Sequence, residues 1–222
     1  MNNFSIFIPA QEKNLYSPDG DLTLFGQNTL LDWKIAQCKK IAKSQDIYIS
    51  SSSKIIASFA QKEGVNFLDR SNRADESFFS QIIEISKNTK KEYILWTNVT
   101  SPFLDERIYT KMLDIINKDK SIDIMQSSIN KFDYAYFKNK KLNFDNTLTK
   151  RTELEPLVLL TNGVFIFKSQ YLKEVDELSI FKTKKYKNYN LDHLASLEVK
   201  DIMSYEIAQD LISIYFKNKL YE

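Results

Sequence analysis

The stretch that decides the fold is Asp46–Arg70, which reads DIYISSSSKIIASFAQKEGVNFLDR. It opens with the short β-rich run Asp46–Ser50, continues with an apolar stripe at helical spacing and stops at Gly64, a residue type that commonly ends helices. The stripe consists of Ile55, Ile56, Phe59 and Ala60. Val65–Leu68 then gives a second β-rich run. A strand, a helix and a strand in this order predict a crossover unit that joins two parallel strands.

The same alternation of strand and helix continues on both sides of this unit. Further strands are predicted at Phe4–Pro9, Tyr93–Trp96 and Ile122–Met125. Three further helices are predicted from apolar residues at helical spacing: Leu31, Ile35, Cys38 and Ile41; Phe78, Phe79, Ile82 and Ile83; and Ile108, Met112, Ile115 and Ile116. We therefore predict an α/β fold with a doubly wound, mostly parallel sheet and helices on both faces. Ligand sites in such sheets lie at the carboxyl ends of the strands.

The pattern changes after residue 126. Tyr134–Phe144 alternates around a polar centre like a β-hairpin, and Val164–Phe167 is predicted as a buried antiparallel strand after a turn at Asn162-Gly163. A last helix carries one apolar face, formed by Ile207, Ala208, Leu211, Ile212 and Tyr215. Because the 222 residues contain no linker and no repeat, we expect residues 1–222 to form one domain with a small antiparallel extension at about 130–160.

Composition and charge exclude several classes of function. The 31 basic and 29 acidic residues give a formal charge of +2, and the lysine clusters are short and scattered, so no nucleic-acid binding is predicted. Cys38 and His193 are single residues of their kinds, which excludes an intrachain disulfide and a zinc site built from histidines. Met1–Pro9 lacks the features of a signal peptide and no apolar run has the length of a membrane span, which favours a cytoplasmic enzyme or binding protein.

Three polar stretches occur at predicted strand ends, where a sheet core does not need polar residues. They are the opening loop Ile8–Asp21 (IPAQEKNLYSPDGD), Thr97–Pro102 (TNVTSP) and Glu198–Ser204 (EVKDIMS). Their positions make them the candidates for the ligand site.

Motifs along nearly the whole chain resemble the acylneuraminate cytidylyltransferase family, the enzymes of the CMP-sialic acid and pseudaminic acid type. Asp46–Arg70 resembles the second and third strand region of that family. The other similar segments are IPA at the opening strand, LFGQNTLLDWKI (L-N-G-K-P-L-I-x-W-x-I), TSP (Q-P-T-S-P), TNGVFIFK (P-N-G-A-I-Y-I-F-K) and LEVKDIMS (L-E-V-Q-D-I-D-T). The resemblance implies the fold of the nucleotide-diphospho-sugar transferases, which is GT-A-like, and dimerisation through the hairpin region.

The resemblance also implies a reaction, in which a hydroxyl of an acidic sugar attacks the α-phosphorus of CTP to give a CMP-sugar and pyrophosphate. Such a step needs cations or amides on the triphosphate, and Mg²⁺ to neutralise charge on the leaving group. CTP and an acidic sugar are thus the expected partners, Mg²⁺ is the expected cofactor and a homodimer is the expected assembly.

The opening loop has almost the length of the family pattern R-G-G-S-K-G-I-P-R-K-N. Its charge is the reverse, because acidic residues stand where that pattern has basic ones. Gln11 stands at the first Arg, and residues 19–21 (DGD) stand at R-K-N. A charge-assisted hydrogen bond contributes about 1.5–3 kcal/mol, so losing two or three without replacement lowers CTP affinity or rate by several powers of ten. The remaining nucleotide candidates are Ala10, Gln11 and Lys13, with Lys13 as the catalytic cation and the amides of 11–15 as a phosphate nest. The alternative is an ordinary surface turn at residues 18–20.

The last motif keeps one of the two acids of the family. Asp201 matches the first acid and Met203 the second, and a thioether is not a ligand for Mg²⁺. A shifted alignment places Glu198 and Lys200 at the two positions instead. Asp201 is therefore the candidate metal ligand and a candidate catalytic residue. The alternative is that Asp201 is only a polar residue near the start of a helix.

Two further residues are candidates for binding the nucleotide. Asn98 stands where the family has Gln before TSP, which keeps the amide chemistry. Arg73, together with Asp75, falls in the stretch that resembles R-P-x-x-L-A-x-D-T.

The acceptor side offers three candidate residues. Asn162 matches the N-G pair of the family, but Leu160 replaces the Arg that precedes this pair in many members. Lys150 or Arg151 is the nearest replacement cation for a sugar carboxylate. The alternative role of Asn162 is that of a turn residue with a positive φ angle.

Three hypotheses on function remain open at this stage. The chain is a divergent, working cytidylyltransferase; or a family member that has lost catalysis and acts as a binding or regulatory protein; or a nucleotidyltransferase for another nucleotide or acidic acceptor. The overall pattern favours the first hypothesis. The loss of the loop cations together with one metal acid favours the second.

Overall fold

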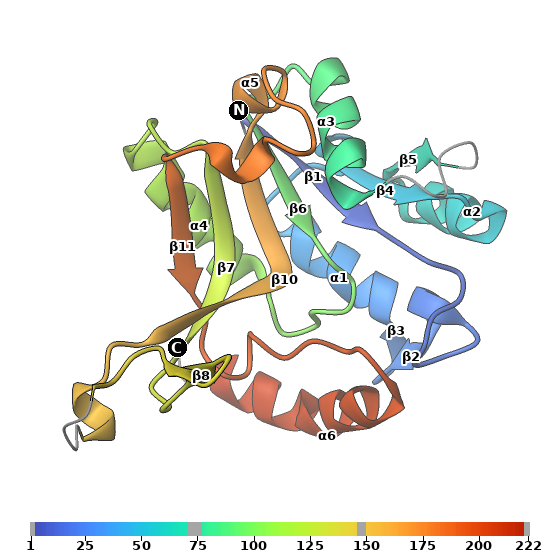
Figure 1. Cartoon of the computed structure of the whole chain (residues 1–222). Helices are drawn as coiled ribbons and strands as arrows, with labels where there is room; N and C mark the ends of the chain where they lie inside the picture. The colour runs from blue at the N-terminus through green and yellow to red at the C-terminus, as the bar shows by residue number, and fades with distance from the viewer. Residues whose placement is uncertain (1–2, 71–76, 146–149, 220–222) are drawn as a thin grey trace.

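The structure is a computed structural model that describes residues 3–70, 77–145 and 150–219. Within these residues one seven-stranded sheet has the order β11-β7-β10-β6-β1-β4-β5 (Figure 1). The strands are β1 Phe4–Pro9, β2 Leu24–Phe25, β3 Asn28–Thr29, β4 Ile47–Ser51, β5 Asn66–Asp69, β6 Tyr93–Thr97, β7 Ile124–Lys131, β8 Tyr136–Phe137, β9 Lys140–Lys141, β10 Leu157–Lys168 and β11 Tyr186–Asn190. The helices are α1 Leu30–Lys39, α2 Lys54–Glu63, α3 Phe78–Asn88, α4 Glu106–Lys118, α5 Ser169–Leu172 and α6 Ile202–Lys219.

The sheet is mostly parallel, so the predicted fold class is confirmed. Strand β1 pairs in parallel with β4 and β6, and β4 pairs in parallel with β5. Strand β10 runs antiparallel between β6 and β7. Strand β11 pairs in parallel with β7 at the edge of the sheet, and it is not predicted from the sequence because its residues YKNYN carry no apolar signal.

Helices cover both faces of the sheet, as predicted (Figure 1). One core lies under α1, α2, α4 and α6, and a second lies under α3 and α5. Strand β1 serves both cores, because successive side chains of a strand point to opposite faces. Ile6 and Ile8 belong to the first core and Phe7 to the second. No helix in the described part of the chain is long and apolar enough to cross a membrane.

The predicted crossover unit is β4-α2-β5. Ser53 begins the helix by accepting hydrogen bonds from the amides of Ile55 and Ile56. Gly64 ends it in the left-handed conformation, with a φ of 66°, as the sequence predicts. The unit brings the residues that follow β4 and β5 to the same edge of the sheet as the opening loop after β1.

A fully buried lysine connects α1 to the loop that follows β6. The ammonium of Lys34 donates to the carbonyl oxygens of Ser101 and Leu104, both at 2.8 Å, and to the hydroxyl of Tyr109 at 2.9 Å. An ammonium has three donors, so all three are used. Burial lowers the pKa of Lys34 to about 8.

The nearest negative charge is also buried and paired. The carboxylate of Asp105 accepts from the guanidinium of Arg107 and, at 2.9 Å, from the hydroxyl of Tyr215 on α6. Cys38 is buried next to Lys34, and burial raises the pKa of its thiol to about 12. Cys38 is therefore an inert buried thiol and not a reactive nucleophile.

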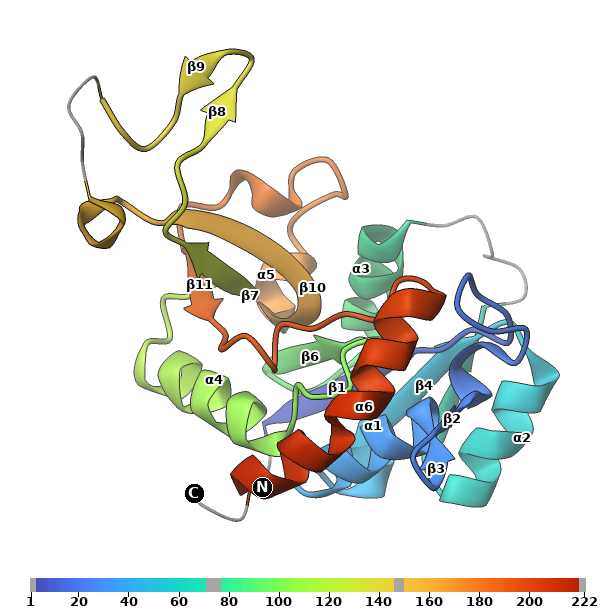
Figure 2. The ribbon, with the colours of Figure 1, turned by 90° about the horizontal axis from the view of Figure 1, so that it is seen from below.

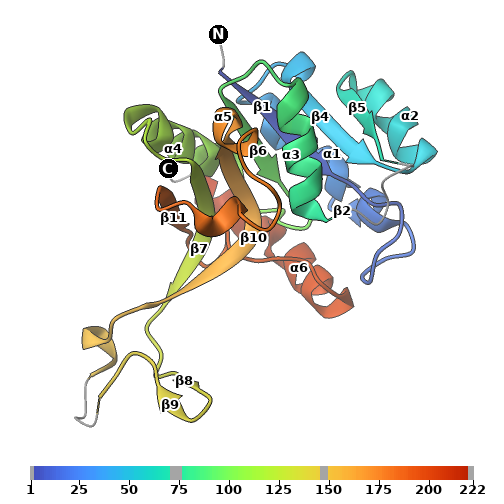
Figure 3. The ribbon, with the colours of Figure 1, turned by 45° about the horizontal axis from the view of Figure 1, so that its top comes forward.

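An extension reaches away from the sheet between β7 and β10, and it carries the β8-β9 pair (Figures 2 and 3). The predicted hairpin in Tyr134–Phe144 is confirmed, and Lys138 and Asn139 form its turn with positive φ angles.

The predicted turn at Asn162-Gly163 is wrong. Strand β10 runs through this pair from Leu157 to Lys168, with a shift in its register to β7 between Leu160 and Phe165. Neither residue has a positive φ. Gly163 instead packs closely against the loop before α4, because a Cβ there would lie 2.6 Å from Cδ1 of Leu104 and would displace this side chain.

The pKa of Lys34 makes stability depend on pH. Because the folded pKa of about 8 lies below the unfolded value of 10.5, the unfolded chain holds more protons above pH 8, and stability rises with pH. We expect urea unfolding to give a free energy on the order of 1 kcal/mol larger at pH 9 than at pH 7.5. Lys34→Met should lose this difference, and it should also destabilise the protein by leaving buried carbonyls unpaired.

Lys62→Met is the matched control, because Lys62 lies exposed on α2. It should keep the pH profile of the wild-type protein. Equal profiles for wild type and Lys34→Met would contradict the assignment.

Candidate functional site

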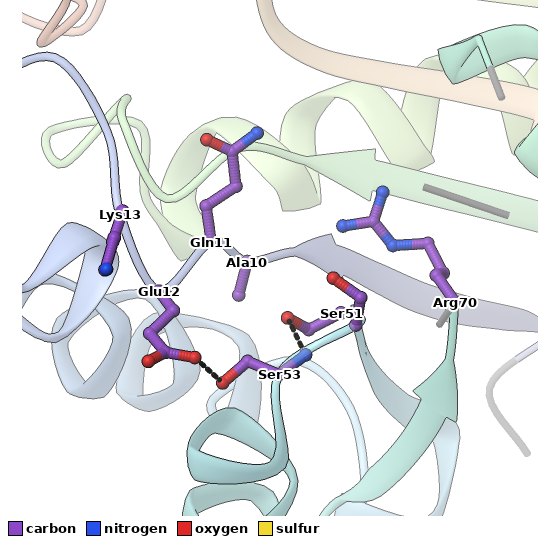
Figure 4. Close-up of a pocket in the computed structure, with 8 residues that line it drawn as sticks. Ala10, Gln11, Glu12, Lys13, Ser51, Ser53 and Arg70 are labelled. Atoms are coloured by element: carbon purple, nitrogen blue, oxygen red, sulfur yellow. Dashed lines mark hydrogen bonds between the residues drawn. The ribbon is translucent and has the colours of Figure 1, made fainter. Parts of the chain in front are cut away.

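A pocket of about 540 Å³ opens at the carboxyl ends of β1, β4 and β5 (Figure 4). This volume is typical of a small-molecule site. Its lining comes from the opening loop, from the serines that precede α2 and from the residue that follows β5. The lining residues are Ala10, Gln11, Glu12, Lys13, Ser51, Ser52, Ser53 and Arg70. The structure thus brings the nucleotide candidates Ala10, Gln11 and Lys13 together.

The acidic end of the opening loop faces the protein instead of the pocket. The buried carboxylate of Asp21 accepts from the amide of Gln11 at 2.7 Å, from the Asn14 side chain at 3.3 Å and from the hydroxyl of Tyr16. Burial raises the pKa of Asp21. The charge reversal seen in the sequence therefore places only the exposed Asp19 at the surface, while Asp21 fixes the shape of the loop.

The loop closes tightly on itself at Gly20. The amide of Asp21 donates to the carbonyl of Gln11 at 2.9 Å. Gly20 has a φ of +55°, and a Cβ there would lie 2.3 Å from the same carbonyl oxygen. Both the left-handed conformation and the close approach of two backbone segments therefore require glycine.

Part of the predicted phosphate nest is occupied within the loop. The amide of Gln11 donates to Asp21, and the amide of Asn14 donates to the carbonyl of Ser17. For the amides of Glu12, Lys13 and Leu15 the structure gives no hydrogen bond within the described residues. Three amides and the exposed Lys13 ammonium thus remain for an anion.

Glu12 is a pocket residue that was not predicted from the sequence. Its Oε2 accepts a hydrogen bond from the hydroxyl of Ser53 at 2.6 Å, and Ser53 caps the amino end of α2. The carboxylate therefore lies at the positive end of a helix dipole, which stabilises its charge.

Arg70 is the second pocket residue missed from the sequence. Its guanidinium donates to Oε1 of Gln81 at 3.0 Å and to the carbonyl of Ser50 at 3.2 Å. Its Nε is buried without a partner among the described residues, and burial lowers the pKa of the group. Arg70 directly follows the predicted strand Val65–Leu68, so its place at a carboxyl end was the signal available. Arg73, the predicted candidate, lies outside the described residues.

Asn98 follows the end of β6 and lies beside Asn162, which stands in the middle of β10 at the shift in its register. The side-chain amide of Asn98 donates to the carbonyl of Asn162 and accepts from Nε1 of Trp96 at 3.2 Å. Both ends of the Asn98 amide are therefore engaged within the protein. The Asn162 side chain is exposed.

The three polar stretches meet at one edge of the sheet. The amide of Val199 donates to the carbonyl of Thr100 at 2.8 Å. The ring of Tyr205 stacks on that of Tyr16, with centroids 6.1 Å apart. The segment before α6 therefore lies against the loop after β6, and the first turn of α6 lies against the opening loop.

Asp201 lies exposed just before α6. Its Oδ1 accepts from the amide and the hydroxyl of Ser204, both at 2.8 Å, and these bonds lower its pKa. The described residues contain no group of three or more His, Cys, Asp or Glu side chains that could hold a metal. Mg²⁺ often takes one or two carboxylates together with substrate phosphates. Asp201 does not line the pocket, and among the described residues it offers a single carboxylate and no preformed metal site.

The two predicted acceptor cations lie on the extension, between β9 and β10. Lys150 approaches Glu153 at 4.0 Å, and Arg151 pairs with Asp133. Neither lines the pocket within this chain.

A sequence model of the family described as Cytidylyltransferase matches residues 18–211. The chain belongs to this family. Comparison with curated protein sequences finds no match.

Solved structures of cytidylyltransferases share the fold. A CMP:2-keto-3-deoxy-manno-octonic acid synthetase complexed with CTP has a TM-score of 0.73 at 10% identity, over 95% of this chain and 98% of that chain. A cytidylyltransferase from Leptospira borgpetersenii has a TM-score of 0.66 at 16% identity, over 96% and 88%. A 4-diphosphocytidyl-2C-methyl-D-erythritol synthase from Anaerococcus prevotii has a TM-score of 0.68 at 11% identity, over 96% and 99%.

Two glycine substitutions test the geometry of the opening loop. Gly20 and Gly64 have similar φ angles of +55° and +66°, but only Gly20 lacks space for a Cβ. Gly64→Ala should lower the free energy of unfolding by about 1–2 kcal/mol, the cost of a left-handed non-glycine residue. Gly20→Ala should lower it further, because the backbone of the loop must move.

Urea unfolding of the two variants measures this difference. Equal losses would show that the loop does not pack as described.

Proposed function

We propose that this protein transfers a cytidylyl group from CTP to a hydroxyl of an acidic sugar, which gives a CMP-sugar and pyrophosphate. One observation carries the proposal: within the described residues, the pocket beside β1, β4 and β5 combines the Lys13 ammonium, loop amides without a hydrogen bond and the guanidinium of Arg70. Membership of the cytidylyltransferase family supports CTP as the donor. The acidic acceptor is supported by the motifs of the acylneuraminate type and by the fold shared with a CMP:2-keto-3-deoxy-manno-octonic acid synthetase.

Some polar groups of the chain bind CTP, and others bind the acceptor sugar. Lys13 and the amides of Glu12, Lys13 and Leu15 hold the phosphates, so that the leaving pyrophosphate meets positive charge. Arg70 binds the nucleoside part of CTP from the opposite side of the pocket. When bound with the nucleotide, Mg²⁺ supplies further positive charge to the leaving group, with Asp201 as its protein carboxylate.

The acceptor hydroxyl attacks the α-phosphorus, and the bond from that phosphorus to the bridging oxygen of pyrophosphate breaks. The hydroxyl proton passes to solvent. Asn162 lies exposed in the middle of β10 and is proposed to contact the sugar. Asn98 positions the backbone of Asn162 through one N–H of its side-chain amide, and its second N–H is proposed to contact the nucleotide.

A homodimer gives the extension a role in the proposed reaction. Apolar side chains of the extension are exposed: Tyr136 by 62%, Phe137 by 61%, Val158 by 45%, Leu159 by 47% and Leu160 by 55%. A patch of this kind marks an interaction site, and we propose that a second copy covers it. In that assembly Lys150 and Arg151 serve the sugar carboxylate at the site of the other copy.

The second candidate function is nucleotide binding without catalysis. It is favoured by the exposed Met203, 68% accessible, at the position where the motif of the acylneuraminate type has a second acid. This function predicts CTP binding without release of pyrophosphate from any acidic sugar.

Nucleotide titration with the full-length chain tests the proposal. Calorimetry with CTP, UTP, ATP and GTP, each with and without Mg²⁺, should show selective CTP binding that strengthens with the metal. Pyrophosphate release in the presence of acidic eight- and nine-carbon sugars then separates catalysis from binding. Absence of binding for every nucleotide at millimolar concentration would overturn the proposal.

Arg70 provides the sharpest variant for this test. Arg70→Met should weaken CTP binding by about 10- to 150-fold, because a charge-assisted hydrogen bond contributes about 1.5–3 kcal/mol. Gln81→Leu is the matched control, since it removes one partner of the guanidinium and keeps its charge. An unchanged dissociation constant in Arg70→Met would remove Arg70 from the nucleotide site.

The dimer is tested by adding charge to the extension. Leu159→Lys should shift the sedimentation coefficient from that of a dimer to that of a monomer. Leu178→Lys is the control, because Leu178 is 85% exposed and lies outside the extension. A wild-type protein that sediments as a monomer at micromolar concentration would exclude this assembly.

A further inference from the structure

The side chain of Glu12 has no role in the reaction described above, although Glu12 lines the proposed nucleotide pocket. A carboxylate next to a triphosphate is repelled by the charge of the phosphates. It is favourable only where it accepts hydrogen bonds from donor groups of the ligand. Its carboxylate is held in place, because the Ser53 hydroxyl donates to it at 2.6 Å. The question is therefore which part of a nucleotide the Glu12 carboxylate faces.

The carboxylate also determines where phosphates do not bind. The amino end of α2 is the natural anion site of the β4-α2 connection. Glu12 already supplies an anion there, and Ser53 uses its own oxygen to cap the amides of Ile55 and Ile56. A phosphate at this helix end would meet like charge. The phosphates are left with Lys13 and the free loop amides.

Glu12 and Arg70 stand on opposite sides of the pocket. The strand order β1-β4-β5 places the serines after β4 between the loop after β1 and the residue after β5. Figure 4 shows Glu12 and Arg70 separated in this way, with Ser51 and Ser53 between them. An ionised carboxylate only accepts hydrogen bonds, and a guanidinium only donates them. The pocket thus presents an acceptor on one side and donors on the other.

This pattern matches the polar edge of cytosine, which has an amino donor next to two acceptors, N3 and O2. Uracil has a carbonyl acceptor in place of the amino group, and this oxygen would face the Glu12 carboxylate. We propose that Glu12 accepts the hydrogen bond of the base amino group while Arg70 donates to the ring acceptors, so that Glu12 makes the pocket select cytosine over uracil. The inference rests on the proposed function and adds the residue that sets its base specificity.

The test compares nucleotide binding by the full-length chain and Glu12→Gln. The Gln carbonyl can still accept from Ser53, while its amide now presents a donor to the base. We expect the ratio of CTP to UTP affinity to fall at least tenfold, through weaker CTP binding and tighter UTP binding. Asp19→Asn is the matched control, an acid-to-amide change at an exposed position of the same loop outside the pocket lining, and it should keep the ratio.

A modified nucleotide tests the same contact without changing the wild-type protein. Pyrimidin-2-one riboside triphosphate lacks the 4-amino group and should bind the wild-type chain at least tenfold more weakly than CTP. The affinities of the two nucleotides for Glu12→Gln should differ less than their affinities for the wild-type chain. The comparison of the two nucleotides on the wild-type chain does not depend on the stability of the variant.

The outcomes separate the inference from the proposed function. CTP binding with an unchanged CTP to UTP ratio in Glu12→Gln, or equal binding of CTP and the analogue by the wild type, overturns the role of Glu12 and leaves the cytidylyltransferase proposal intact. Failure of the wild type to bind any of the nucleotides overturns both.

Discussion

The buried ammonium of Lys34 is the interaction on which the arrangement of the site depends. It ties α1 to the loop after β6 by two carbonyls and to α4 by the hydroxyl of Tyr109. The same loop holds the backbone of Asn162 through Asn98, and it holds the segment before α6 through Thr100. A single charged group in the core therefore organises three surface segments that are distant in sequence. A buried charge of this kind is stable only with every donor paired, which makes the loop geometry strict.

Most of the fold could be predicted from the sequence because the first 126 residues repeat one physical pattern. Strands β1, β4 and β6 there are almost entirely buried and each helix has an apolar stripe, so the periodicity reports the structure directly. The prediction failed in two strands outside that pattern. Strand β11 is a polar edge without an apolar run, and the first half of β10 carries the apolar run Leu157–Leu160 but exposes most of it, so an apolar run and burial do not coincide there. The Asn-Gly pair misled for another reason: Gly163 meets the need for close packing against Leu104, which a turn rule does not consider.

The location of the candidate site could be predicted from the sequence, but the contacts of its side chains could not. The carboxyl ends of the strands located the pocket, and Gln11 and Lys13 line it. Residue letters do not tell in which direction a side chain points, so the inward turn of Asp21 and the place of Glu12 at α2 required coordinates. Arg70 and Arg73 are equivalent as letters; the structure places Arg70 in the pocket at the end of β5, and Arg73 lies outside the described residues. Membership of the cytidylyltransferase family supports the class of reaction and leaves the altered residues to be explained one by one.

The bonds around Asp21 have a consequence for how the loop evolved and how it binds. In a loop shaped by its ligand, ordering the backbone costs conformational entropy at each binding event, about 1–2 kcal/mol for every residue fixed. Here the fold of the loop is held by contacts within the chain, made by Asp21, Gly20 and the backbone of Gln11. Such preorganisation removes much of that entropic cost and offsets part of the affinity lost with the missing cations. It also separates the shape of the loop from its charge, so that the residues facing the pocket could be exchanged while the backbone stayed in place.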